Sequence, residues 1–237
     1  MKIINMSADR GFTLIETMLG LMIFAVLAAS LYSVFHGGVR LDQRSSGINK
    51  INHELRMGFE AMTRDLENTF VYDFSGSYPK QKSLTGTADQ LTFLAATDSG
   101  IKAVSYYLGR PDFGHITKTV IGRHVTSLRS VVTNSQKESP YIFLLRCEQD
   151  FASFLNNKKE GREEEILMSF VQKGGLKFHY AKAKDRSWEW QDDWQEVQLP
   201  KAVAIEVVLV DPDDMYKTLT MRRDVAIPVS VGTQDAK

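Results

Sequence analysis

Hydrophobic and polar residues follow three different patterns along this chain of 237 residues. From Phe12 to Phe35 nearly every residue is apolar, and about 24 residues in a helix span about 36 Å, more than the roughly 30 Å hydrocarbon core of a bilayer. From Ile48 to Phe70 apolar residues recur at steps of three and four, which predicts one face of an amphipathic helix. From about Asp73 onward, short runs rich in β-branched and aromatic residues predict strands.

Several of the later runs alternate apolar and polar residues, the period of a half-buried strand. The predicted strands are Gln90–Ala95, Lys102–Leu108, Thr117–Ile121, Tyr141–Arg146, Glu165–Val171, Leu176–Ala181, Ala202–Val210 and Lys217–Val225. Gly174-Gly175 predicts a hairpin turn between two of them, and the polar segments Thr126–Ser139 and Asn156–Glu165 predict loops. We therefore expect an α+β fold, in which one long N-terminal helix packs on an antiparallel β-sheet.

Composition excludes several classes of protein. Lys+Arg and Asp+Glu both number 29, so the formal net charge of zero gives no sign of a nucleic-acid partner. The single cysteine, Cys147, excludes an internal disulfide and a cysteine-rich zinc site. The histidines are scattered, and neither a Gly-x-Ser-x-Gly elbow nor a phosphate-binding glycine loop occurs, so we expect no enzyme, no cofactor and no metal. Asp211-Pro212-Asp213-Asp214 could offer oxygens to calcium, although an acidic turn between strands is the commoner explanation.

The apolar run near the N-terminus has three ordinary interpretations. A secretory signal has an apolar core of about 7–15 residues, shorter than this run, although Ala28-Ala29-Ser30 could pass for its cleavage site. A buried core helix would carry a polar face, which is absent. A plain single-span anchor fits the length but leaves Glu16 unexplained, because a lone carboxylate in a span costs a few kcal/mol.

The residues around the start of this run carry a more specific signal. Gly11-Phe12-Thr13-Leu14-Ile15-Glu16, directly after Arg10, resembles the cleavage and methylation motif of type IV prepilins and type II secretion pseudopilins. The resemblance implies that a prepilin peptidase cleaves after Gly11 and methylates the new amino group of Phe12. A glycine allows the peptidase close approach to the backbone, and the anchor survives because the signal precedes it.

Glu16 acquires a role under this interpretation. In a fibre the apolar helices bundle away from water, where a carboxylate needs a cation. The resemblance implies that this cation is the N-terminal amine of Phe12 in a neighbouring subunit. The alternative is that Glu16 only reaches the lipid headgroups.

The C-terminal half resembles the J-type minor pseudopilin of type II secretion. The similarity rests on Leu176-Lys177-Phe178-His179-Tyr180, on Trp188, Trp190 and Trp194, on Leu199-Pro200-Lys201-Ala202-Val203, and on Arg64-Asp65-Leu66. Core packing of a hairpin is our preferred interpretation of the tryptophans, with a partner contact as the alternative. The apolar run contains no proline and the chain has no cysteine pair, which departs from many major pilins and favours a minor subunit.

The resemblance implies a pilin-like organisation with a leader peptide at 1–11, a transmembrane helix at 12–35, an amphipathic continuation at 36–72 and a β-rich periplasmic region at 73–237. Ile48 and Ile51 are predicted to contact other subunits, because they lie nearest the membrane, where the sheet is least expected to reach. Phe59, Met62 and Leu66 are predicted to be internal.

The implied function is that of a tip or initiation subunit in a short inner-membrane fibre that drives protein export. The implied partners are the prepilin peptidase, minor pseudopilins of the I, K and H types, and the major pseudopilin. The implied location is the inner membrane, with one span and a periplasmic domain. Two alternatives stay open: a minor pilin that primes a type IV pilus for adhesion, motility or DNA uptake, and a plain membrane-anchored periplasmic binding domain.

Overall fold

The computed structural model describes residues 13–74, 78, 81–110, 116–119, 141–158, 161–184, 187–211 and 216–228, without the side chains of 40–48, 50, 116–119 and 141. The chain divides into two compact units, Met1–Ser46 and Gly47–Lys237.

Helix α1 runs without interruption from Leu14 to Glu67, 54 residues in all. Its end at Glu67 corrects the predicted continuation to Tyr72. The helix ends because the next residues hydrogen-bond to a strand instead: Ala96 N–H donates to the carbonyl of Asn68 (3.1 Å) and Phe70 N–H to that of Leu94 (3.4 Å). The chain thus leaves the helix directly onto the sheet.

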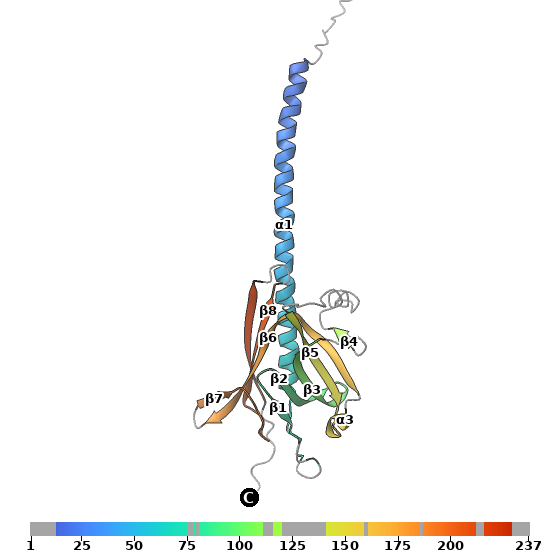
Figure 1. Ribbon diagram of the computed structural model, residues 1–237, viewed down its shortest axis with the longest axis vertical. Helices are drawn as coiled ribbons and strands as arrows, with labels where there is room; N and C mark the ends of the chain where they lie inside the picture. Colours follow the sequence, from blue (N-terminus) through green and yellow to red (C-terminus); the bar gives the residue numbers. More distant parts are fainter. Residues whose placement is uncertain are drawn as a thin grey trace, which may run out of the picture. The chain divides into compact units, whose positions relative to one another are not determined.

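In the described part of the second unit, nine strands form one sheet (Figure 1); seven follow the order β1-β2-β3-β5-β6-β8-β9, and β4 and β7 each pair with β6. Strand β4 lies parallel to β6, whereas β7 and all other neighbours pair antiparallel. The strands are β1 Leu84–Gly86, β2 Gln90–Thr97, β3 Gly100–Gly109, β4 Ile116–Thr119, β5 Tyr141–Asp150, β6 Arg162–Lys184, β7 Ser187–Gln191, β8 Ala202–Val210 and β9 Thr218–Ala226; a short helix, α3, covers Phe151–Leu155. The predicted α+β class is confirmed.

The predicted hairpin turn at Gly174-Gly175 is wrong. Strand β6 continues through both glycines for 23 residues, pairing with β5 before them and mainly with β8 after them. Gly174 has φ +72°, and a Cβ on Gly175 would lie 2.9 Å from the carbonyl oxygen of Gln172 and 3.0 Å from that of Val208. The glycines therefore allow a shift in register, a bulge, at the point where β6 changes partners.

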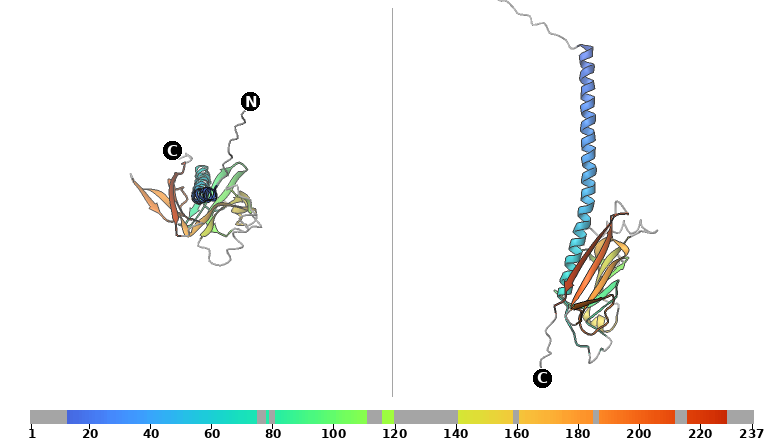
Figure 2. Two further views of the ribbon diagram at one scale, coloured as in Figure 1. Left: turned by 90° about the horizontal axis from the view of Figure 1, so that it is seen from above. Right: turned by 90° about the vertical axis from the view of Figure 1, so that its left-hand side faces the viewer.

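The core lies between the sheet and the part of α1 that belongs to the second unit; Figure 2 shows the sheet curling about this part of the helix. Leu55, Phe59, Met62 and Leu66 are all at most 2% exposed, as expected for one helical face. Gly58 lies so close to β6 that an added Cβ would meet the terminal carbon of Met168 at 2.3 Å. The helix and the sheet are in close contact there because the glycine has no side chain.

A buried acid, Glu54, connects α1 to an irregular stretch of β6. Its side chain is 2% exposed, and Oε2 accepts a hydrogen bond from the backbone N–H of Ser169 (3.0 Å). The next residue, Phe170, has φ +59°, which a non-glycine residue rarely adopts. The register between β5 and β6 shifts here. Glu54 accepts the hydrogen bond of the Ser169 N–H at this shift.

Candidate processing and assembly site

Thr13 determines where helix α1 begins. Its Oγ1 accepts a hydrogen bond from the backbone N–H of Glu16 (3.3 Å), and its carbonyl oxygen accepts from the N–H of Glu16 (3.1 Å) and Thr17 (3.2 Å). Thr13 is therefore the N-cap, and Thr13-x-x-Glu16 has the sequence of a capping box. The acidic Glu16 in the first turn also suits the positive end of the helix dipole. Sequence reasoning missed this role, although the spacing of threonine and glutamate signals it.

Two of the predicted site residues, Gly11 and Phe12, lie outside the described residues. Glu16 lies on the exposed surface of α1, among apolar side chains that are exposed as well. The stretch Leu14–Val39 is long and apolar enough to cross a membrane, with a mean hydropathy of 2.2, and none of its most apolar window is buried within the chain. This helix therefore needs an apolar environment from outside the chain, which a bilayer or a bundle of similar helices provides.

The predicted division between contact residues and core residues needs a correction. Phe59, Met62 and Leu66 are internal, as predicted. Ile51 is only 7% exposed and belongs to the same core, because the sheet extends further along α1 than the sequence suggested. The side chain of Ile48 lies outside the described part of the chain.

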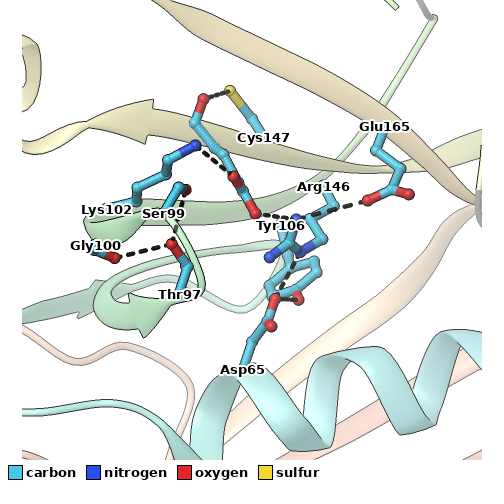
Figure 3. Close-up of polar contacts among 10 residues, drawn as sticks. Asp65, Thr97, Ser99, Gly100, Lys102, Tyr106, Arg146, Cys147 and Glu165 are labelled. Carbon is cyan, nitrogen blue, oxygen red and sulfur yellow. Dashed lines mark hydrogen bonds and ion pairs between the residues drawn. The ribbon is translucent and has the colours of Figure 1, made fainter. Parts of the chain in front are cut away.

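A buried charged cluster joins the C-terminal end of α1, at Asp65, to the sheet (Figure 3). Oδ2 of Asp65 accepts hydrogen bonds from the Tyr106 hydroxyl (2.5 Å) and from Nε of Arg146 (2.6 Å). The guanidinium also donates to Oε1 of Glu148 (2.6 Å) and lies 3.5 Å from Oε2 of Glu165. Lys102 donates to the second oxygen of Glu148 (2.9 Å). The cluster therefore connects α1, β3, β5 and β6.

The electrostatics of the cluster agree with this geometry. Burial raises the pKa of Tyr106, and the neighbouring Asp65 carboxylate raises it further. Burial lowers the pKa of Arg146, but Tyr106, Asp65 and Glu148 more than offset this and hold it above its ordinary value. Burial raises the pKa of Glu148, but the hydrogen bonds and charges of Lys102 and Arg146 outweigh it and lower this pKa below its ordinary value. The cluster thus consists of charged groups and one neutral hydroxyl, that of Tyr106, which stabilise one another.

This cluster holds the helix on the sheet through charge-assisted hydrogen bonds. Among the described residues, no group of three or more His, Cys, Asp and Glu side chains is placed to hold a metal ion. Of the acidic turn Asp211–Asp214, only Asp211 is described. Cys147 is 5% exposed, and burial raises the pKa of its thiol to about 11, so the reactive thiolate is scarce at neutral pH.

The three tryptophans do not share one role. Trp194 is 2% exposed and donates from Nε1 to the carbonyl of Gln198 (2.8 Å). The centres of its ring and of the Tyr180 ring are 6.4 Å apart. Core packing is therefore confirmed for this residue. Core packing is wrong for Trp188 and Trp190, which are 57% and 41% exposed. They lie on β7, a strand that the sequence did not predict.

One comparison with known protein families bears on the N-terminal segment. Residues 6–32 match the prokaryotic N-terminal methylation motif, the type IV pilin-like prepilin signal. The match covers the junction at Gly11, the cap at Thr13 and most of the exposed apolar helix. The motif implies processing by a prepilin peptidase and anchoring in the membrane through one helix. Together with the long helix and the curled antiparallel sheet, it supports the assignment of this chain to the type IV pilin-like proteins, the pilins and pseudopilins.

Proposed function

We propose that this chain is a minor pseudopilin of the J type, a non-enzymatic subunit at the tip of a short inner-membrane fibre of a type II secretion system. It would help to start fibre assembly and so drive protein export, with its β-rich domain in the periplasm. The observation that carries the proposal is the methylation motif at residues 6–32, which runs into an apolar helix that no other part of the described chain covers. Type IV pilin-like proteins are in general structural rather than enzymatic.

The J-type assignment rests on the sequence resemblance in the C-terminal half and at Arg64-Asp65-Leu66 on α1. Its Leu-Pro-x-Ala-Val segment, Leu199–Val203, leads into strand β8, and Trp194 lies in the core beside Tyr180. Asp65, from the Arg64-Asp65-Leu66 segment of the same resemblance, holds the buried cluster. Each of these segments thus takes part in the packing or the connections of the folded domain. On the J-type resemblance, we propose that I-, K- and H-type minor pseudopilins and the major pseudopilin are the partners.

Within the fibre, we assign Glu16 the task of pairing with the methylated N-terminal amine of Phe12 in a neighbouring subunit. Leaving one partner of such a pair alone in an apolar bundle is strongly unfavourable, so the pair would select the correct register between helices. Ile48 remains our candidate for a contact between subunits, whereas Ile51 belongs to the core.

Processing is the first test. Replacing Gly11 with a bulky residue should leave full-length precursor in the membrane, whereas the unaltered chain should yield a mature protein that begins at Phe12 with one added methyl group. Intact-mass measurement of the purified protein distinguishes the precursor from the cleaved and methylated chain. A mature protein that begins after Ala29 would instead identify a secretory signal and contradict the proposal.

A minor pilin of a type IV pilus is the second candidate, because the methylation motif is common to pilins and pseudopilins. The genes beside this one separate the two candidates. An operon that encodes an outer-membrane secretion channel supports the pseudopilin, and an operon for a surface pilus supports the minor pilin. Deleting the gene should abolish export of secreted enzymes in the first case and piliation in the second.

A further inference from the structure

The hairpin of β6 and β7 places two large aromatic side chains on the surface. Trp188 is 57% exposed and Trp190 is 41% exposed, while Trp194, a few residues later, is buried. An isolated exposed apolar residue is ordinary, but two tryptophans together on one strand form an apolar patch. Tryptophan is also the residue type most enriched among the energetically dominant residues of protein interfaces.

Both tryptophans lie on one face of the hairpin. Trp190 pairs with Ala181 and Trp188 pairs with Ala183. Side chains alternate between the two faces of a strand, and Phe178 and Tyr180 of β6 point into the core, so Ala181, Ala183 and both tryptophans lie on the other face. This is therefore the face of β6 that is turned away from the core. Figures 1 and 2 show β7 projecting sideways from the rest of the sheet.

The patch is held in place before any partner binds. The guanidinium carbon of Arg222, on strand β9, lies 5.6 Å from the centre of the Trp190 ring, a cation–π contact that holds this indole over the sheet. Strand β7 is joined to β6 from Tyr180–Gln191 to Lys184–Ser187. A contact surface with fixed side chains loses less conformational entropy on binding than a flexible one.

The described charges on the tryptophan face balance one another. The strand register places two positive and two negative side chains on this face, Lys177, Arg222, Glu206 and Asp224, and Arg222 donates to Asp224 (3.1 Å). A strongly charged partner would gain little here, because these charges already have counterparts. An apolar centre with a polar rim is instead the anatomy of a protein–protein contact.

We propose that Trp188 and Trp190 form a contact surface for the globular domain of a neighbouring subunit, whose own contact surface is apolar at its centre and carries no excess charge. The inference rests on the proposed function, because it requires a fibre that contains other subunits. Because the two indoles lie on a face whose described charges cancel, the partner that fits it is a neighbouring globular domain with an apolar, uncharged contact surface.

The test uses the full-length chain in membranes, with and without co-expressed I- and K-type minor pseudopilins. Ala183→Cys places a small thiol on the tryptophan face and leaves both indoles intact. Glu189→Cys is the matched control, because it lies on the same strand as the tryptophans and its side chain points to the opposite face. The native Cys147 is buried, so a maleimide reacts mainly with the introduced thiol. With the partners present, we expect labelling of Ala183→Cys to slow at least about fivefold and labelling of Glu189→Cys to change less than about twofold.

A second variant tests the tryptophan directly. Trp188→Ala should weaken co-purification of the partner at least about tenfold, whereas Ile101→Ala, which truncates a side chain 42% exposed on β3, should leave it unchanged. Both variants should still be processed after Gly11, and the complex should resist a rise in salt because the described charges on this face balance one another.

The remaining outcomes separate the two proposals. If the unaltered chain is processed and co-purifies with its partners, but Ala183→Cys is labelled equally fast with and without them, the contact surface is wrong and the proposed function stands. Protection of Ala183→Cys in the absence of the partners, by lipid or by further copies of this chain, also overturns the inference. Absence of processing and of co-purification in the unaltered chain overturns the proposed function and the inference together.

Discussion

Asp65 on α1 and Arg146 on β5 form a buried ion pair, with 2.6 Å between Oδ2 and Nε. The two residues are 6% and 9% exposed, and the Tyr106 hydroxyl donates to the same carboxylate oxygen. Because 81 positions separate them in the sequence, this pair is a long-range connection between the last turns of the helix and the centre of the sheet.

Removing one partner of this pair should be costly. We expect Asp65→Ala to lower the free energy of unfolding by about 3 kcal/mol or more, because it leaves the Tyr106 hydroxyl and part of the Arg146 charge without their acceptor. Glu60→Ala is the control: it breaks the exposed pair with Arg56 and should cost less than about 1 kcal/mol. Urea unfolding of the protein in detergent, followed by near-ultraviolet circular dichroism, measures both. Equal effects of the two substitutions would contradict the role of the buried cluster.

The lowered pKa of Glu148 predicts how stability depends on pH. A carboxyl whose pKa is lower in the folded protein contributes stability above its ordinary pKa of 4.5, and this contribution is lost as the pH falls below that value through the lowered pKa. We therefore expect the unfolding free energy to decline below about pH 5. Glu148→Gln should be less stable at pH 7 but should show a shallower decline. Parallel pH profiles for the two proteins would refute this assignment.

Ile51 is now expected to behave as a core residue. Ile51→Ala should reduce the free energy of unfolding by about 2–4 kcal/mol, comparable to Phe59→Ala, because each leaves a cavity in the same cluster. The control is Ile101→Ala, at an exposed position of β3, which should cost less than about 1 kcal/mol. A selective loss of subunit binding in Ile51→Ala, without loss of stability, would restore the original interpretation of this residue as a contact.

A close approach at the edge strand β1 gives a steric prediction. A Cβ on Gly86 would lie 1.9 Å from the hydroxyl oxygen of Tyr180 and 2.4 Å from its ring, and an aromatic ring cannot bend away as a flexible chain can. Gly86→Ala should therefore destabilise the fold by about 1–3 kcal/mol. Thr85→Ala, on the same strand, should have a much smaller effect. A thermal midpoint for Gly86→Ala equal to that of the unaltered protein would show that Tyr180 moves freely.

Glu16→Leu separates anchoring from assembly. The substitution makes the span more apolar, so membrane insertion and cleavage after Gly11 should persist. Assembly should be impaired, because the neighbouring amine loses its partner. Crosslinking between subunits and export of secreted proteins measure this effect, and Thr17→Leu, in the same helical turn, serves as the control. Unchanged crosslinking in Glu16→Leu would exclude the pairing.

Much of the fold could be predicted because the patterns in the sequence have local causes. The apolar run, the helical stripe around Phe59 and the alternating strands each follow from the period of one element. Strand β8 was predicted at its observed bounds, since its residues are all apolar except Glu206, many of them are β-branched, and a proline precedes it.

The features that were missed depend on contacts between distant parts of the chain. Gly174-Gly175 has the local sequence of a turn, yet Val208 and the partners of β6 on either side make it a bulge within one strand. The short strands β1 and β7 have too few residues for a periodic signal. Asp65 and Arg146 have ordinary sequence surroundings, and only the packing of α1 on β3 and β5 shows that both are buried.

The uninterrupted strand β6 has a consequence for cooperativity. Its first part is hydrogen-bonded to β5 and its second part to β8, so the two sides of the sheet share one backbone. Val171 is paired on both sides, with Ile142 of β5 and Leu209 of β8, so the two ladders meet just before the glycine bulge. Amide protons on β5 and on β8 should therefore exchange with solvent through the same global opening rather than through two independent ones.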